Sequence, residues 1–404
     1  MDLDLTTARC GCWNCSVSLY HHCVRKFLRP QVAPSSGSVI TFVQPISFHT
    51  MPSTPTQKAI VIRGLKKAEL VSDRPIPNLR DDYILVKTAA VALNPTDWKN
   101  IDNLGMDGAL SGCDYAGTVE EVGKGVSKQW KKGDRVAGFA HGGDVVQHEN
   151  GAFAEYIVAK GDIQMAVPDG VSFEEAATLG IGVFTVGQGL YQSLGLPLPT
   201  EPAKEAFPVL IYGGSTATGS LAIQFAKLSG LMVITTSSPK NFSLCKSVGA
   251  DAVFDYNDPS AAEEIRKRTD NKLKYAFDTI SVEQSAAICA AALSSASGCT
   301  YSSLIPAKLP RQDIENKYSL VYTIANEYFR MGQQGPEFPA EQQDFDFAKK
   351  FGGIAEKLLA EGKFKVHPPS VRKDGLKGVL EGLQELREGK VSGAKLVYKI
   401  SETP

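Results

Sequence analysis

The segment Phe207–Leu231, FPVLIYGGSTATGSLAIQFAKLSGL, restricts the possible folds of this chain more than any other. Four apolar residues, Val209–Tyr212, have the length and composition of a buried parallel strand. Gly213-Gly214 ends this run, and an amphipathic helical pattern follows. A strand, a glycine turn and a helix open a dinucleotide-binding unit, where N–H groups at the helix start hold a pyrophosphate. Because Ser215 replaces the second glycine of G-x-G-x-x-G, an ordinary strand-to-helix turn fits the segment equally well.

The residues after this segment alternate between strand and helix patterns. Strands are expected at 232–236, 252–254, 275–277 and 299–304, and helices at 239–248, 259–269 and 283–292. Such alternation predicts a doubly wound parallel sheet with right-handed crossovers. The sequence therefore predicts an α/β cofactor lobe.

The residues before it, from Lys58 to about Ala177, are rich in short strand patterns. These are Tyr83–Ala92, Ala116–Val122, Arg135–Phe139 and Ala152–Val158, separated by Gly, Asp and Lys turns. Ser172 is a natural N-cap, with Glu175 at the capping-box position of a following helix. Helices at 342–361 and 374–388 and a strand at 394–400 are expected to return to this lobe. We therefore predict two lobes with a cleft between them.

The amino-acid composition excludes some classes of function. The chain has 404 residues, with 43 basic and 44 acidic side chains that are well mixed. This balance excludes a strongly basic surface for nucleic acid or anionic membranes, and no apolar run is long enough for a membrane span. Half of the eight cysteines lie in the first 23 residues and the others are isolated, which favours a reducing, cytoplasmic protein.

The N-terminal 50 residues differ from the rest. Six possible zinc ligands occur there: Cys10, Cys12, Cys15, His21, His22 and Cys23. Their spacing lacks the paired C-x-x-C of common structural zinc sites. Asp2 and Asp4 argue against a mitochondrial transit peptide, whereas the nearby basic residues argue for one. We expect residues 1–57 to form a disordered tail or a gene-model extension.

The end of the second strand of the cofactor lobe bears on the choice of nucleotide. An acid at that position selects NAD through the ribose 2′-OH, and small polar or basic residues admit a 2′-phosphate. Here the strand runs into Thr235–Asn241, TTSSPKN, which contains no acid. Ser238 and Lys240 would suit a phosphate, and Tyr256 after the third strand would flank the adenine or reach the phosphate. Alternatively, Ser238 and Lys240 only cap and solubilise a helix start. The pattern favours NADPH over NADH.

Several motifs resemble a known family. Gly133–Val136 (GDRV), the strand–glycine–helix unit and Glu388–Gly393 (EGKVSG) are similar to the medium-chain dehydrogenase/reductases over about residues 58–400. More narrowly, Asn94–Lys99 (NPTDWK), Gly112–Gly117 (GCDYAG) and Tyr212–Thr218 (YGGSTAT) resemble the trans-acting enoyl reductases of fungal polyketide synthases. The resemblance implies a GroES-like, β-rich catalytic domain at 58–180 and 342–404. It also implies a Rossmann NADPH-binding domain at 181–341.

Zinc alcohol dehydrogenases of this superfamily have a cysteine in the early loop and a later Gly-His-Glu. This chain has Asn94 in that loop and Gly112-Cys113-Asp114 in place of Gly-His-Glu. It also has no cysteine between Cys113 and Cys245, so the four-cysteine structural zinc lobe is absent from the sequence. Because a zinc site needs several N or S ligands at compatible spacing, we expect no metal, with Cys113 a small packed residue.

The resemblance also implies site residues. Cofactor contacts fall on Thr96, Asp97, Trp98, Lys99, Ser215, Thr216, Ala217, Thr218, Ser238, Pro239, Lys240, Asn241, Tyr256, Leu304, Ile305, Val391 and Ser392. Substrate contacts fall on Val183, Phe184, Thr185, Val186, Gly187, Gln188, Gly189 and Leu190, and on Thr323, Ile324, Ala325, Asn326 and Glu327. Lys99 and Thr185 are the catalytic candidates. In the competing interpretation, Thr323–Glu327 is an ordinary strand and Lys99 a surface lysine. No residue is singled out as the proton donor.

The function implied by this resemblance is NADPH-dependent reduction of an α,β-unsaturated thioester carried by a synthase. Hydride goes to the β-carbon and a proton to the α-carbon, so positioning and electrostatics dominate the catalysis. The expected partner is a polyketide synthase or a synthase–peptide synthetase hybrid, and the expected state is a monomer. Two alternatives stay open: a free-standing quinone or enone reductase, and a redox-inactive NADPH-binding regulator.

Overall fold

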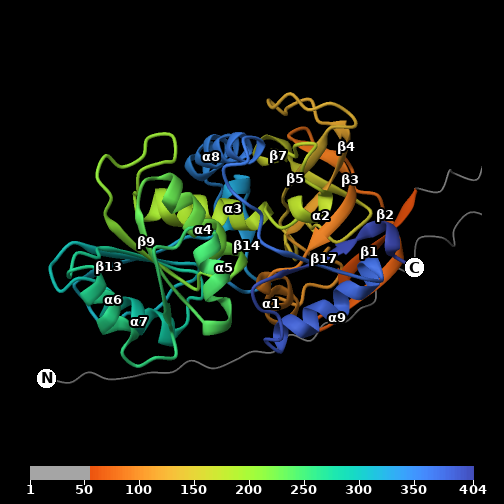
Figure 1. The fold of residues 1–404 in the computed structure, drawn as a ribbon. Helices are drawn as coiled ribbons and strands as arrows, with labels where there is room; N and C mark the ends of the chain where they lie inside the picture. The colour runs from red at the N-terminus through yellow and green to blue at the C-terminus, as the bar shows by residue number, and fades with distance from the viewer. Residues whose placement is uncertain (1–54) are drawn as a thin grey trace, which may run out of the picture. The chain divides into compact units, whose positions relative to one another are not determined.

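The computed structural model describes residues 55–404, which contain two large β-sheets (Figure 1). The predictions for the cysteine- and histidine-rich segment and for residues 1–54 of the tail lie outside these residues. The predicted tail boundary at residue 57 is wrong, because Thr56 and Gln57 already belong to the strand β1 (Thr56–Ile62). No helix in residues 55–404 has both the length and the apolar character needed to cross a bilayer.

The first sheet has the strand order β16-β17-β3-β4-β5-β7, with β6 paired to β3. Its strands are β3 (Tyr83–Ala92), β4 (Asp114–Val122), β5 (Arg135–Phe139), β6 (Tyr156–Lys160), β7 (Met165–Ala166), β16 (Pro369–Arg372) and β17 (Lys395–Lys399). A separate antiparallel pair, β1 (Thr56–Ile62) and β2 (Ala68–Pro75), packs with it in one hydrophobic cluster. The last strand of the chain thus returns to this sheet, as predicted, because β17 pairs with β3.

The second sheet is parallel throughout, in the order β10-β9-β8-β11-β12-β13. Its strands are β8 (Pro208–Tyr212), β9 (Met232–Ser237), β10 (Ala252–Asp255), β11 (Tyr275–Asp278), β12 (Cys299–Ser303) and β13 (Ile314–Tyr318). The strand order reverses between β8 and β11, which is where doubly wound folds bind dinucleotides. The predicted alternation of strands and helices is confirmed.

Helices cover both faces of this sheet (Figure 1). They are α4 (Ala217–Leu228), α5 (Phe242–Ser247), α6 (Ala261–Arg268) and α7 (Glu283–Ala292). Val209 and Ile211 belong to the hydrophobic cluster that contains α4, whereas Leu210 and Tyr212 belong to the cluster with α6 and α7. An apolar residue at every position of β8 is explained by this burial on both faces.

Two long segments join the sheets. One is α3 (Gly180–Val186), continued by the π-helical turn η2 (Gly187–Ser193), and the other is α8 (Gln342–Ala360). α8 places Phe351 and Ala355 in the cluster of α3 and α4, and also contacts β7 of the first sheet. α9 (Gly375–Arg387) packs against β17 and α1 (Pro95–Asn103). The proposed domain boundaries at 180/181 and 341/342 stay a prediction.

Three details differ from the sequence prediction. The strand expected at Ala152–Val158 begins only at Tyr156, because Ala154 makes an isolated bridge to Ala59 and does not continue a ladder. The helix expected at 239–248 is split into the 3₁₀ turn η3 (Pro239–Asn241) and α5. The alternative that Thr323–Glu327 is a strand is wrong: Val321–Ala325 form the 3₁₀ helix η4, which ends at the left-handed Asn326 (φ 53°).

Candidate cofactor and substrate site

The turn between β8 and α4 is tightly packed. Gly213 has a φ of +83°, a conformation that favours glycine. A Cβ at Gly214 would overlap the Oγ1 of Thr235, and a Cβ at Gly219 would overlap the carbonyl oxygen of Gly213. Thr216 caps α4, its Oγ1 accepting from the N–H of Gly219 at 2.9 Å. The remaining orphan N–H groups of the first helical turn suit an anion.

The carboxyl ends of the parallel strands bring most of the predicted cofactor residues to one edge of the sheet. Ser215–Thr218 follow β8, Ser238–Asn241 follow β9, Tyr256 follows β10, and Leu304–Ile305 follow β12. Leu304 is fixed there by its N–H, which donates to Ser281 Oγ at 2.8 Å.

The C-terminal loop also reaches this edge. The Nδ2 of Asn241 donates to the Oγ of Ser392 at 2.9 Å, which places Val391-Ser392 beside the end of β9. Lys240 is exposed at the start of the following helix, and no acid stands between Thr235 and Asn241. The tight glycine turn at the carboxyl edge of the parallel sheet therefore fits a nicotinamide dinucleotide.

The predicted contacts of the N-P-T-D-W-K motif lie on the first turn of α1. Thr96 is partly exposed, and its Oγ1 lies 2.6 Å from the phenol oxygen of Tyr322. Asp97 is buried and its Oδ2 accepts from the N–H of Asn94 at 2.7 Å, closing a capping box. Burial raises the pKa of Asp97 to about 7. Lys99 is exposed, with its Nζ 5.8 Å from the centre of the Trp98 ring.

The two predicted substrate segments meet in the structure. Gln188 Nε2 donates to Thr323 Oγ1 at 3.0 Å and to Asp344 Oδ2 on α8 at 3.1 Å. Thr323 also donates to Asp344. One carboxylate thus holds η2 and η4 together.

Other residues of these segments lie elsewhere. Val183, Val186 and Leu190 are in the hydrophobic cluster of the second lobe. Thr185 is buried and its hydroxyl donates to the carbonyl of Ile181 at 2.7 Å, within its own helix. Glu327 forms an ion pair with Lys160, with an Nζ–Oε1 distance of 3.3 Å.

Three residues at this site escaped the sequence prediction: Tyr322, His141 and Asn100. The rings of His141 and Tyr322 stack with centroids 4.2 Å apart, and Asn100 Nδ2 donates to the phenol oxygen at 3.2 Å. Tyr322 lies next to the predicted Thr323–Glu327, and Asn100 follows the N-P-T-D-W-K motif. The closeness of Tyr322 and Asn100 to these predicted segments was the available signal. Nothing in the sequence showed that the two residues contact each other.

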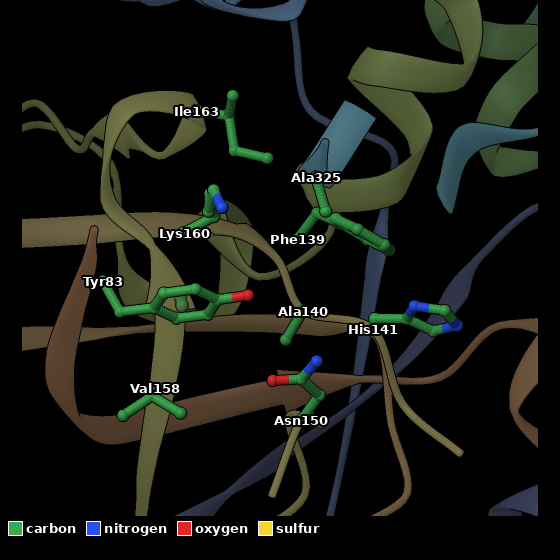
Figure 2. Close-up of a pocket in the computed structure, with 10 residues that line it drawn as sticks. Tyr83, Phe139, Ala140, His141, Asn150, Val158, Lys160, Ile163 and Ala325 are labelled. Atoms are coloured by element: carbon green, nitrogen blue, oxygen red, sulfur yellow. The ribbon is translucent and has the colours of Figure 1, made fainter. Parts of the chain in front are cut away.

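A small pocket lies next to His141 and is lined mainly by residues of the first sheet (Figure 2). Its volume is about 10 Å³, room for about one water molecule. Figure 2 shows Tyr83 and Lys160 on one side of it and His141 on the other. Burial lowers the pKa of His141, partly offset by Asp144, whose Oδ2 lies 3.6 Å from Nδ1. The imidazole is therefore neutral near pH 7.

The positions that correspond to zinc ligands in related dehydrogenases do not fit a metal. Asp114 is fully buried and pairs with Lys395, while Asn94 Nδ2 donates to the same carboxylate at 2.9 Å. Its other oxygen accepts from the N–H of Ile181 at 2.6 Å. Burial raises the pKa of the Cys113 thiol well above its usual value, so it stays protonated. Among residues 55–404, no group of three His, Cys, Asp or Glu side chains is arranged to hold a metal ion.

Comparison with known proteins agrees with this geometry. The family model for the alcohol dehydrogenase GroES-like domain matches residues 80–169, and the zinc-binding dehydrogenase model matches residues 217–319. A putative zinc-dependent alcohol dehydrogenase from Rhizobium etli has the same fold, with a TM-score of 0.71, 22% identity, and coverage of 85% of this chain and 98% of that one. The enoyl reductase CurK gives a TM-score of 0.65 at 19% identity, over 85% and 99% of the two chains. The fold and the site define a medium-chain dehydrogenase/reductase.

Relatives with higher sequence identity identify the family within this class. Trans-enoyl reductase TOXD of Cochliobolus carbonum is 59% identical over 69% of this chain and 93% of its own length. Trans-enoyl reductase ACTTS2 of Alternaria alternata is 49% identical over 85% and 99%. The chain belongs to the trans-enoyl reductases, a family of oxidoreductases whose class uses a nicotinamide cofactor.

Proposed function

We propose that this protein is a trans-acting, NADPH-dependent enoyl reductase that reduces an α,β-unsaturated polyketide thioester in secondary-metabolite biosynthesis. The observation that carries the proposal is the similarity, almost along their full length, to proteins named trans-enoyl reductases. The relatives' name also supports a partner in trans, a polyketide synthase or a synthase–peptide synthetase hybrid that presents the acyl chain. A monomer suffices for such a role.

The cofactor proposal rests on the edge of the parallel sheet. Ser215–Thr218 and the start of α4 would hold the pyrophosphate, and Ser238–Asn241 with Tyr256 would hold the adenosine 2′-phosphate end. Val391-Ser392 and Leu304-Ile305 would close over the nucleotide. The bound nicotinamide supplies the hydride that the reduction needs. NADPH is favoured because Lys240 adds a cation where NAD-binding relatives of the fold place an acid.

The substrate proposal rests on the junction of η2, η4 and α1. The Gln188–Thr323–Asp344 hydrogen bonds would fix the wall of the acyl pocket. Thr96 and Lys99 on α1 would lie at the reacting end. Of the two catalytic candidates, Lys99 is exposed. Its side chain is therefore accessible to a cofactor or substrate that binds from solvent. Thr185 has its proton committed to Ile181, so we assign it an acceptor or packing role.

An NADPH-oxidation assay tests this function. We expect the protein to oxidise NADPH with crotonyl-pantetheine thioester and to be much slower with a simple quinone. Rapid quinone reduction without thioester reduction would identify a quinone reductase instead. Saturable NADPH binding with no turnover on either would identify a non-catalytic NADPH-binding protein.

A further inference from the structure

The phenol of Tyr322 lies against the N-P-T-D-W-K motif, with its oxygen 2.6 Å from Thr96 Oγ1. It comes from η4, which follows the last strand of the second sheet, and it reaches α1 of the first lobe. Only 4% of Tyr322 is exposed. Its ring stacks on His141 and lies 5.9 Å from both the Phe139 and the Phe329 ring, centre to centre. The phenol is therefore held in one orientation.

The hydrogen-bond partners of the phenol give its proton one acceptor among the described residues, Thr96 Oγ1. Asn100 Nδ2 can only donate, so the phenol oxygen accepts from it, at 3.2 Å. The same amide nitrogen donates to the carbonyl of Gly142 at 2.9 Å, which fixes the side chain. The phenol O–H is then free to donate to Thr96 Oγ1, 2.6 Å away. In this arrangement the hydroxyl proton of Thr96, the partly exposed member, points away from Tyr322.

We propose that Thr96 and Tyr322 form a proton relay that protonates the α-carbon of the substrate after hydride transfer. This inference rests on the proposed enoyl reductase function and supplies the proton donor that this function lacks. Thr96 is the catalytic residue because it would touch the substrate. Tyr322 acts through Thr96.

Hydride addition to the β-carbon leaves an enolate, with the electron pair shared between the α-carbon and the thioester oxygen. The Thr96 O–H bond breaks as the α-carbon–hydrogen bond forms and the thioester carbonyl is restored. The phenol proton moves to Thr96 Oγ1 in the same step, so no free alkoxide forms. The phenolate keeps the Asn100 hydrogen bond and takes a proton from water after product leaves. The net reaction consumes one hydride and one solvent proton.

The surroundings of Tyr322 keep its phenol protonated until the reaction needs the proton. Burial raises the pKa of Tyr322 well above its usual value, so the phenol is fully protonated in the resting enzyme. A phenol is ordinarily a much stronger acid than the α-C–H of a thioester, which favours proton transfer to the enolate. The other candidates are less suitable: His141 is neutral and its Nδ1 faces Asp144, and the Thr185 proton is held by Ile181.

The test uses the full-length protein, NADPH and 2-methylcrotonyl-pantetheine thioester in D₂O. The wild type should give a product with one configuration at the deuterated α-carbon. Tyr322→Phe and Thr96→Val should each lower kcat by roughly 10²-fold, with KM changed less than about threefold. Both variants should give a mixture of α-configurations, because solvent then delivers the deuteron from either side. Thr96→Ser keeps the hydroxyl and should keep rate and configuration.

Tyr318→Phe is the matched control, since Tyr318 is 50% exposed and outside the proposed site. It should leave rate and product configuration unchanged. A single α-configuration from Tyr322→Phe and Thr96→Val, at any rate, would overturn the relay, because a purely structural defect slows the enzyme without scrambling the product. A wild type that reduces no enoyl thioester would overturn the proposed function instead.

Discussion

At the scale of single residues, Lys240 decides the cofactor prediction. It is exposed beside the end of β9, where a 2′-phosphate would lie. Lys240→Glu should weaken NADPH binding about 10- to 100-fold, because a charge-assisted hydrogen bond of roughly 1.5–3 kcal/mol is replaced by repulsion. Fluorescence titration measures this change.

Two comparisons make the Lys240 experiment specific. NADH binding should change little in the same variant, since NADH has no 2′-phosphate. Lys267→Glu, an equal charge change on the exposed face of α6, should leave NADPH affinity as in the wild type. Unchanged NADPH affinity in Lys240→Glu would place Lys240 outside the phosphate site.

The buried His367 should make the free energy of unfolding depend on pH. It is buried, with Nδ1 2.8 Å from the Oγ of Ser220 on α4. Burial, with repulsion from Lys395, lowers its pKa to about 4, although the backbone of Ala394 opposes this shift. Below the unfolded pKa of about 6.5, the unfolded chain binds a proton that the folded chain does not. The free energy of unfolding should therefore fall as the pH drops from 6.5 to 4, by roughly 3 kcal/mol from this group.

Urea denaturation at several pH values checks this prediction. His367→Gln keeps a hydrogen-bonding group near Ser220 but does not titrate, so its stability should vary less between pH 6.5 and 4. The same slope in both proteins would show that other groups cause the acid sensitivity.

At the scale of elements, regular helices and strands could be predicted from the sequence, whereas irregular helices could not. The expected helix 283–292 and strand 83–92 coincide with α7 and β3, because an alanine-rich run favours a helix and a run with Tyr, Ile and Val favours a strand. The π-helical turn η2 and the 3₁₀ helix η4 have no such signature. Both owe their shape to packing and hydrogen bonds with distant elements, including Asp344 on α8.

Gly189 in η2 gives a test of that packing. A Cβ there would overlap the ring of Phe277 on β11. Gly189→Ala should lower the free energy of unfolding by about 1–3 kcal/mol, the usual effect of overpacking. Gly353→Ala on α8 is the matched control, because nothing lies within 4 Å of its Cβ position. It should raise stability by about 0.5–1 kcal/mol through helix propensity. Equal effects of the two substitutions in urea denaturation would contradict the packing argument.

At the scale of the whole molecule, a buried ion pair connects distant parts of the chain. Lys395 on β17 pairs with Asp114 on β4, and Asp114 also accepts from the backbone of Ile181 on α3. Lys395→Met should cost about 3–5 kcal/mol, because the carboxylate is left buried without its cation. Thermal and urea unfolding measure the loss.

The double variant Lys395→Met with Asp114→Asn provides the control. Removing the second charge should restore part of the lost stability, since the uncompensated charge is gone while the amide oxygen can still accept from the N–H of Ile181. Additive losses in the double variant would show that the pair contributes through packing alone.

The sequence by itself determined the architecture and indicated the cofactor. Strand and helix periodicity, the glycine turn after β8 and the acid-free end of β9 are local properties, and parallel strands bring their carboxyl ends together wherever the rest of the chain runs. The tertiary structure alone decided which polar groups meet at the proposed reacting end. Thr96 and Tyr322 are 226 residues apart, and their contact depends on how the end of the second sheet packs against α1. No local pattern records such packing, because it results from the burial of many side chains at once.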